Sequence, residues 1–261
     1  LEICVDSIES AINAIEGGAD RLELCSALSE GGLTPTPGLL REVKNYIKNT
    51  NHSTKLFVMI RCRRGNDFVY TDREMEIMMY DLSQLLLHGA DGFVFGALND
   101  VGEIHKEYCE QILKTEGIEG KCKSVTFHRA FDVTKKSQMK ENLKILSEMG
   151  YQRVLTSGYE NSCFLGLENL IEISREATKL NISIMPGAGV STENIIEILR
   201  RTNSTEIHAS ARSPKIQFVT SQISMGGNDS DLEVQSVCNK AIVEELKNCI
   251  KIVDEERCHE Q

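Results

Sequence analysis

A four-residue pattern ending in cysteine occurs twice near the start of the chain. Leu1-Glu2-Ile3-Cys4 is repeated as Leu22-Glu23-Leu24-Cys25. On adjacent parallel strands, Cys4 and Cys25 would lie about 4.8 Å apart, although a stagger between the strands would weaken this geometry. Two thiolates at that separation can hold Cu(I) in near-linear coordination, because soft sulfur ligands select Cu(I) and zinc. The alternative is that both are small buried apolar side chains, a common role for a free cysteine.

Charged and histidine side chains interrupt several of the apolar segments that surround these cysteines. The period-two alternation of a strand places Glu2, Glu23 and Arg61 on the inner faces of three neighbouring strands. Buried charges need partners, so these three could neutralise one another as a structural network. They could instead form a catalytic pocket, in which His128 is a general acid or base and Arg61 holds an anionic substrate group. The candidate catalytic residues are Glu2, Glu23, Arg61, His128, Arg129, Asp132 and His208.

The elements that would position these residues alternate along the whole chain. Short segments rich in Val, Ile, Leu and Phe predict strands at 1–6, 21–26, 55–62, 92–97, 124–130, 153–157, 182–186 and 206–211. Segments of helical period predict helices at 7–17, 37–49, 73–88, 104–115, 137–149, 166–179, 192–202 and 231–256. Eight alternations at this length predict an α/β fold, a (β/α)₈ or TIM barrel with an extended C-terminal helix. An open doubly wound sheet is the alternative, but it would want a glycine-rich turn where Asp6-Ser7-Ile8-Glu9 stands.

A glycine-rich loop follows the seventh predicted strand. Gly187 and Gly189 allow the backbone to approach a ligand closely, and Ser210 lies near the end of the eighth predicted strand. Loops after strands seven and eight form the phosphate site of many barrels of this kind. These three residues are therefore a candidate phosphate or anion site, against the alternative of a structural turn.

Composition narrows the classes of function. The 261 residues are 41% hydrophobic and carry a net charge of −10, which argues against a nucleic-acid partner. No apolar run is long enough to span a membrane. The nine cysteines are odd in number and include no CxxC, which favours a reducing compartment. No domain boundary is evident, so we expect one domain over 1–261, with 213–230 irregular.

The ordered motifs resemble those of the CutC copper homeostasis family over residues 1 to about 226. The carriers include Gly17-Gly18-Ala19-Asp20, Gly31-Gly32-Leu33-Thr34-Pro35, Met59-Ile60-Arg61, Gly89-Ala90-Asp91-Gly92, Thr126-Phe127-His128-Arg129-Ala130-Phe131-Asp132, Leu155-Thr156-Ser157-Gly158 and His208-Ala209-Ser210-Ala211. The form with Cys4-Val5-Asp6-Ser7 resembles the eukaryotic members. One departure is Cys62, where the family usually has proline.

The resemblance implies a TIM barrel that takes part in copper handling. It implies Cu(I) binding through Cys4 and Cys25, and assembly into dimers or tetramers. The expected location is the cytoplasm, with the nucleus left open as a second compartment.

Two hypotheses for the function stay open. In the first, the chain binds Cu(I) through cysteine thiolates, without turnover. In the second, it is a barrel enzyme that acts on a small anionic or phosphorylated metabolite at the C-terminal mouth of the barrel; fold alone cannot decide. No motif argues for a third role as an oligomeric scaffold for a protein partner.

Overall fold

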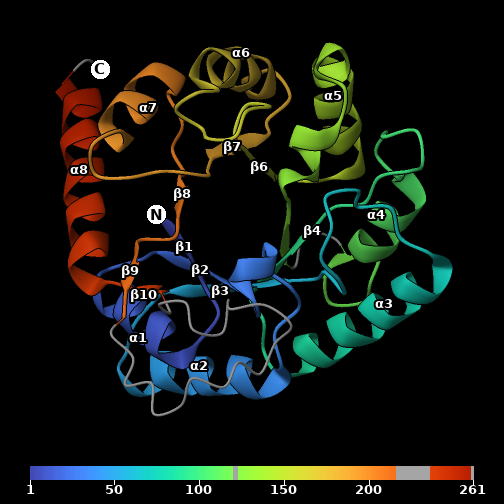
Figure 1. The fold of residues 1–261 in the computed structure, drawn as a ribbon, viewed down its shortest axis with the longest axis horizontal. Coiled ribbons are helices and arrows are strands. Elements are labelled where there is room, and N and C mark those ends of the chain that lie inside the picture. Colours follow the sequence, from blue (N-terminus) through green and yellow to red (C-terminus); the bar gives the residue numbers. More distant parts are fainter. Residues whose placement is uncertain (120–122, 216–235, 260–261) are drawn as a thin grey trace, which may run out of the picture.

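Eight parallel strands form a nearly closed barrel surrounded by helices, as Figure 1 shows. The computed structural model describes residues 1–119, 123–215 and 236–259. The barrel strands are β1 (Glu2–Val5), β2 (Arg21–Leu24), β3 (Lys55–Met59), β4 (Gly92–Phe95), β5 (Ser124–Phe127), β6 (Arg153–Thr156), β7 (Ser183–Pro186) and β8 (His208–Ala209). Hydrogen-bonded neighbours follow the order β7-β6-β5-β4-β3-β2-β1-β8. This order confirms the predicted (β/α)₈ barrel and excludes the open doubly wound sheet.

A helix follows each barrel strand and covers its outer face. The helices are α1 (Ile8–Glu16), α2 (Pro37–Asn49), α3 (Asp72–Leu87), α4 (Lys106–Leu113), α5 (Met139–Met149), α6 (Leu167–Thr178), α7 (Ile195–Thr202) and α8 (Lys240–His259). Capping residues set several starts: the Ser7 hydroxyl accepts from the Ser10 backbone N–H, and Thr71 and Glu74 form a reciprocal capping box before α3. Helix starts that depend on such local capping contacts can therefore be predicted from the sequence.

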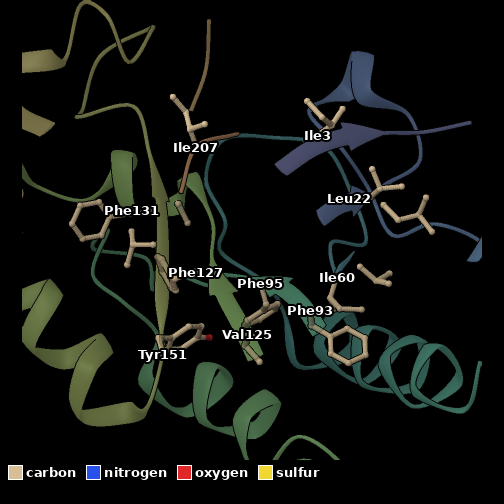
Figure 2. Packing of buried hydrophobic residues seen from close by; sticks show 14 of the residues in the cluster. Ile3, Leu22, Ile60, Phe93, Phe95, Val125, Phe127, Phe131, Tyr151 and Ile207 are labelled. Carbon is tan, nitrogen blue, oxygen red and sulfur yellow. The ribbon is translucent and has the colours of Figure 1, made fainter. Parts of the chain in front are cut away.

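The main hydrophobic core lies between the strands and the helices. Ile3, Leu22, Phe93 and Phe127 are fully buried there and point outward from the barrel (Figure 2). Alternate residues point inward, where Cys25, Phe57, Met59 and Val94 form a second, smaller apolar cluster. The predicted strand faces are confirmed for β1 and β2, because Glu2, Cys4, Glu23 and Cys25 are all buried and lie off the outer core.

The predicted last helix starts too early. Residues 236–238 form β10 (Ser236–Cys238), which pairs antiparallel with β9 (Arg212–Pro214), and α8 begins only at Lys240. Residues 213 and 214 of the segment predicted to be irregular therefore belong to a strand, while 216–230 of that segment and 231–235 of the predicted helix lie outside the described residues. The spacing of apolar residues over only three positions is compatible with either a strand or a turn of helix, so it could not predict β10.

Helix α8 completes the ring of helices. It packs between α7 and α1, and Val243 of α8 lies so close to Gly17 that a Cβ there would be 2.6 Å from the Val243 Cβ. Strands β7 and β8 approach each other at Gly187, the residue that follows β7. A Cβ at Gly187 would lie 3.2 Å from the Cβ of His208 on β8. The two strands at the ends of the sheet order, β7 and β8, thus lie next to each other.

Candidate functional site

Three side chains with metal-binding atoms converge inside the barrel. Cys4 of β1, Glu23 of β2 and His208 of β8 are buried, and one ligand atom of each lies within 4.8 Å of the others. The three strands are neighbours in the sheet, and Glu2 of β1 is paired in register with His208 of β8. Sequence reasoning had named all three residues but had not grouped them as one site.

The imidazole of His208 is held between two carboxylates. Its Nδ1 lies 2.8 Å from Glu2 Oε1, and its Nε2 lies 3.8 Å from Glu23 Oε2. The other oxygen of Glu2 accepts a hydrogen bond from Arg21 Nε. Arg21 therefore fixes Glu2, and Glu2 fixes the ring of His208, an arrangement typical of the outer-shell support of metal-binding histidines.

Burial and these contacts shift the pKa values of the three titratable groups. Burial alone would raise the pKa of Glu2, but Arg21 and His208 lower it to about 2. Burial raises the pKa of Glu23 to about 7, with His208 opposing and Glu2 adding to the rise. Burial would lower the pKa of His208, but the charge of Glu23 and the hydrogen bond to Glu2 raise it well above its usual value. Glu2 is therefore ionised at neutral pH, whereas Glu23, whose pKa is about 7, is protonated in part of the molecules.

Cys25 lies beside this cluster but is not one of its three members. The register pairs Cys4 with Glu23, so Cys25 lies two residues farther along β2 than the position opposite Cys4. Its thiol is fully buried and donates a hydrogen bond to Glu23 Oε2 at 3.7 Å. Burial raises the pKa of the Cys25 thiol well above its usual value, with the charge of Glu23 next. The stagger between the two cysteines follows from a register that the repeated sequence does not encode.

Arg61 does not neutralise Glu2 or Glu23, and this part of the prediction is wrong. Its guanidinium donates to the backbone carbonyls of Gly31, Gly32 and Gly65, at 3.0, 3.4 and 2.5 Å. Arg61 follows the end of β3, and its side chain reaches the loops above the barrel rather than its interior. Arg21, two residues before Glu23 on β2, is the cation that pairs with Glu2.

His128 also lies at the C-terminal mouth but away from Glu23 and Glu2. Its Nδ1 accepts a hydrogen bond from the backbone N–H of Ala130 at 3.2 Å, so His128 caps the short helical turn Arg129–Val133. Burial lowers the pKa of His128 to about 3, and Arg61 adds to the effect. The ring is therefore neutral at pH 7, with its proton on Nε2.

The Asp132 carboxylate accepts hydrogen bonds from several groups in the loops after β5 and β6. It accepts from the hydroxyls of Thr156 and Ser157, from the backbone N–H groups of Ser157 and Tyr159, and from Arg129 Nε. Arg129 donates in addition to the Ser157 hydroxyl at 2.8 Å. These contacts tie the loop after β5 to the loop after β6, which is a structural role.

Two of the three predicted anion-site residues, Gly189 and Ser210, line a small cavity of about 180 Å³. It is lined by Cys4, Arg129, Leu155, Ala188, Gly189, Val190, His208, Ala209 and Ser210. Gly187 is not part of the lining: a Cβ there would lie 2.6 Å from the Leu155 side chain, so a packing constraint accounts for this glycine. The cavity brings Gly189 and Ser210 to the same opening as Cys4 and His208, and it gives a small ligand a route to them.

An ion network at the opposite, N-terminal end of the barrel was missed by sequence reasoning. Glu206 accepts from Arg21 and from Arg153 at 2.6 Å each. Both guanidinium groups lie over the Phe57 ring, at 4.9 and 5.5 Å from its centroid. Strand parity could have found Arg21, which shares its face with Glu23, but Arg153 of β6 and Glu206, just before β8, are far away in the sequence.

The fold and the cluster together define a (β/α)₈ barrel protein with a buried Cys–Glu–His group that could hold a metal ion. The CutC family model matches residues 1–213, and the chain belongs to the CutC family. It is 45% identical over 233 residues to the human copper homeostasis protein cutC homolog, covering 87% of this chain and 80% of that protein. It is 41% identical over 239 residues to the Drosophila melanogaster homolog, covering 88% and 87%.

A solved structure supports the same assignment. The putative copper homeostasis protein CutC from Streptococcus agalactiae superposes with a TM-score of 0.73 at 31% identity, covering 80% of this chain and 97% of that one. Among the described residues, no helix is both long enough and apolar enough to cross a membrane. Copper homeostasis is therefore the process to which the family ties this chain.

Proposed function

We propose that this protein binds Cu(I) inside the barrel through the thiolates of Cys4 and Cys25, with the His208 imidazole as a third ligand. The observations that carry the proposal are the approach of Cys4, His208 and Glu23 to within 4.8 Å of one another in a buried site, and the hydrogen bond from the Cys25 thiol to Glu23. Sulfur and imidazole ligands suit Cu(I), whereas a carboxylate is a harder donor that suits it poorly.

Glu23 has a different role in this proposal. Its Oε2 accepts from the Cys25 thiol and faces His208 Nε2, so it contacts two of the proposed ligands. Cysteine binds metal as the thiolate, so copper binding must displace the thiol proton. Glu23 is the group that orients Cys25 and stands next to that proton.

The experiment is an anaerobic Cu(I) titration against a competing chromophoric chelator. Wild type, Cys4→Ser, Cys25→Ser and the double variant are compared, with Cys109→Ser as the control, because Cys109 is fully buried in the outer core. We expect one tight site that is weakened in each single variant and lost in the double variant, and that is unchanged in the control. Unchanged stoichiometry in the double variant would refute the proposal.

A zinc titration in parallel distinguishes the metals. A Cys–Glu–His set without Cys25 also suits Zn²⁺, for which carboxylate and imidazole are ordinary ligands. Copper binding through sulfur predicts that Glu23→Gln retains tight Cu(I) binding and that Cys25→Ser does not. The opposite result would assign the site to a divalent ion.

The enzyme hypothesis retains one supporting observation, the cavity that opens onto Cys4 and His208 beside Arg129 and Ser210. A screen of small phosphorylated compounds for turnover, with His208→Gln as the negative control, tests it. We further propose a homo-oligomer in the cytoplasm, in keeping with the family resemblance. Light scattering of the purified protein and fractionation of cells test these two points.

A further inference from the structure

Arg61 is a buried cation that forms no ion pair with any carboxylate in the part of the chain that the structure describes. Its side chain follows β3, and the residue is 4% exposed. Two loops surround it with carbonyl oxygens, from Gly31, Gly32 and Gly65, which accept hydrogen bonds from both terminal nitrogens but bring no net charge. Its Nε has no hydrogen-bond partner. A buried charge in this state is costly unless a counter-charge is supplied.

His128 offers a second unused donor in the same region. It is also 4% exposed, and its Nε2 has no hydrogen-bond partner. Because Nδ1 accepts from the Ala130 backbone N–H, the proton of the neutral ring is on Nε2, which is therefore an unpaired N–H donor. Buried donors of this kind are nearly always satisfied in native proteins, by protein, water or a ligand.

Arg61 and His128 both lie against the ring of Phe68. The guanidinium carbon of Arg61 lies 5.0 Å from the centroid of the Phe68 ring, and the His128 ring lies 4.9 Å from the same centroid. Gly96, directly after β4, leaves the space in which His128 sits, because a Cβ there would be 2.7 Å from His128 Nδ1. The side chain of His128 thus lies against the end of β4, the strand between β5 and β3 in the barrel.

We propose that Arg61 Nε and His128 Nε2 bind a small oxyanion, a phosphate or carboxylate group of a metabolite, at the C-terminal mouth of the barrel. The anion would supply the counter-charge that Arg61 lacks and would accept from both unpaired donors. Arginine suits this role because its planar guanidinium matches the oxygens of carboxylate and phosphate. Because these residues follow β3 and β5, the site is separate from the Cys4 cluster on β1, β2 and β8, and it does not depend on copper binding.

The test measures thermal unfolding of the copper-free protein with increasing inorganic phosphate or malonate, against sodium chloride at equal ionic strength. A ligand that binds only the folded state raises the melting temperature in a saturable way. We expect such a rise for wild type, and an affinity at least about tenfold weaker in Arg61→Gln, which loses a charge-assisted hydrogen bond. Stabilisation by phosphate alone would indicate a phosphorylated ligand, and stabilisation by malonate alone a carboxylate.

Control variants separate this site from general effects of salt and from the copper site. Arg64→Gln removes an exposed arginine of the same loop and should bind the anion as wild type does. Cys4→Ser should also retain anion binding, so that failure of the copper proposal leaves this one intact. Failure of both phosphate and malonate to stabilise the wild type, or equal stabilisation of wild type and Arg61→Gln, would overturn the proposal.

A second measurement covers the case in which Arg61→Gln does not fold. His128→Asn keeps an acceptor for the Ala130 N–H but is too short to place a donor at the position of Nε2. We expect it to fold and to lose anion affinity. In wild type, the ¹⁵N-detected imidazole N–H signal of His128 should shift as phosphate or malonate is added. A signal that stays unmoved at saturation would contradict direct contact.

Discussion

Cys4 and Glu23 face each other in register across the parallel strands β1 and β2, and the Cys25 thiol donates to the same Glu23 carboxylate. This carboxylate therefore accepts from the Cys25 thiol and lies within 4.8 Å of the Cys4 sulfur, without being a soft ligand itself. On the other side, His208 lies between Glu23 and Glu2. Acids, thiols and an imidazole thus lie close together on β8, β1 and β2. The acid Glu2, which supports His208, can be tested separately from the proposed ligands.

Glu2→Gln should weaken the copper site without removing a ligand. Glu2 holds His208 Nδ1 at 2.8 Å and pairs with Arg21, so the substitution weakens the support of the ring by removing its charge and leaves Arg21 with Glu206 as its one ion-pair partner among the described residues. Loss of an outer-shell partner typically costs 10- to 100-fold in metal affinity, so we expect a loss of about this size in the Cu(I) titration. Breaking a buried ion pair should also lower the free energy of unfolding by about 3 kcal/mol, measured in urea.

The control for this variant is Glu16→Gln. Glu16 accepts from Tyr46 and Lys240 at the surface of the molecule. It should retain wild-type copper affinity. Wild-type copper affinity in Glu2→Gln as well would show that His208 needs no such support or is not a ligand.

His128 should make the protein less stable in acid. Its pKa is about 3 in the folded chain against 6.5 for an ordinary histidine, so between these values the unfolded chain binds a proton that the folded one does not. Its contribution is complete above pH 6.5 and declines as the pH falls, by at most about 1.4 kcal/mol per pH unit.

His128→Asn removes this titration and keeps the acceptor for Ala130. Urea denaturation from neutral pH down to about 5 should therefore show a steeper loss of stability in wild type than in the variant. Parallel curves for the two proteins would mean that His128 is charged in the folded state.

Asp132→Asn should destabilise the loops after β5 and β6 but leave copper binding intact. The carboxylate is 7% exposed and accepts from five different groups, several of which an amide nitrogen would oppose. We expect a loss of about 2–4 kcal/mol in the free energy of unfolding. Asp100→Asn, at an exposed position, is the control and should change little. A stable Asp132→Asn protein with reduced copper affinity would instead indicate a functional carboxylate.

Gly92→Ala should disturb the interior of the barrel. A Cβ at this position would lie 2.6 Å from the Phe57 ring and 2.7 Å from the backbone oxygen of Ser124. Phe57 would have to move from beneath Arg21 and Arg153, and overpacking of this kind typically costs about 1–3 kcal/mol. Gly38→Ala, near the start of α2, meets only the Thr36 hydroxyl at 3.8 Å and should be neutral. Thermal melting of the two variants compares them directly.

Much of the fold could be predicted because it depends on local patterns. Apolar runs and helical periods located the eight strands and eight helices, and strand parity placed Glu2, Cys4, Glu23 and Cys25 inside the barrel. The early start of the last helix was an error at 236–238, where pairing with Arg212–Pro214 decides the structure. Such a pairing joins residues far apart in sequence, so no local pattern reports it.

The sequence by itself determined the barrel, the family and the residue types available for chemistry. Only the tertiary structure decided their partners: Glu2 pairs with Arg21 and His208, Arg61 lies among backbone carbonyls, and the register sets Cys4 opposite Glu23. The physical reason is that parity fixes the face of the sheet on which a side chain lies, whereas register and loop path fix which charge it meets. In a buried site, the charged partner that each side chain meets sets its pKa and therefore its chemistry.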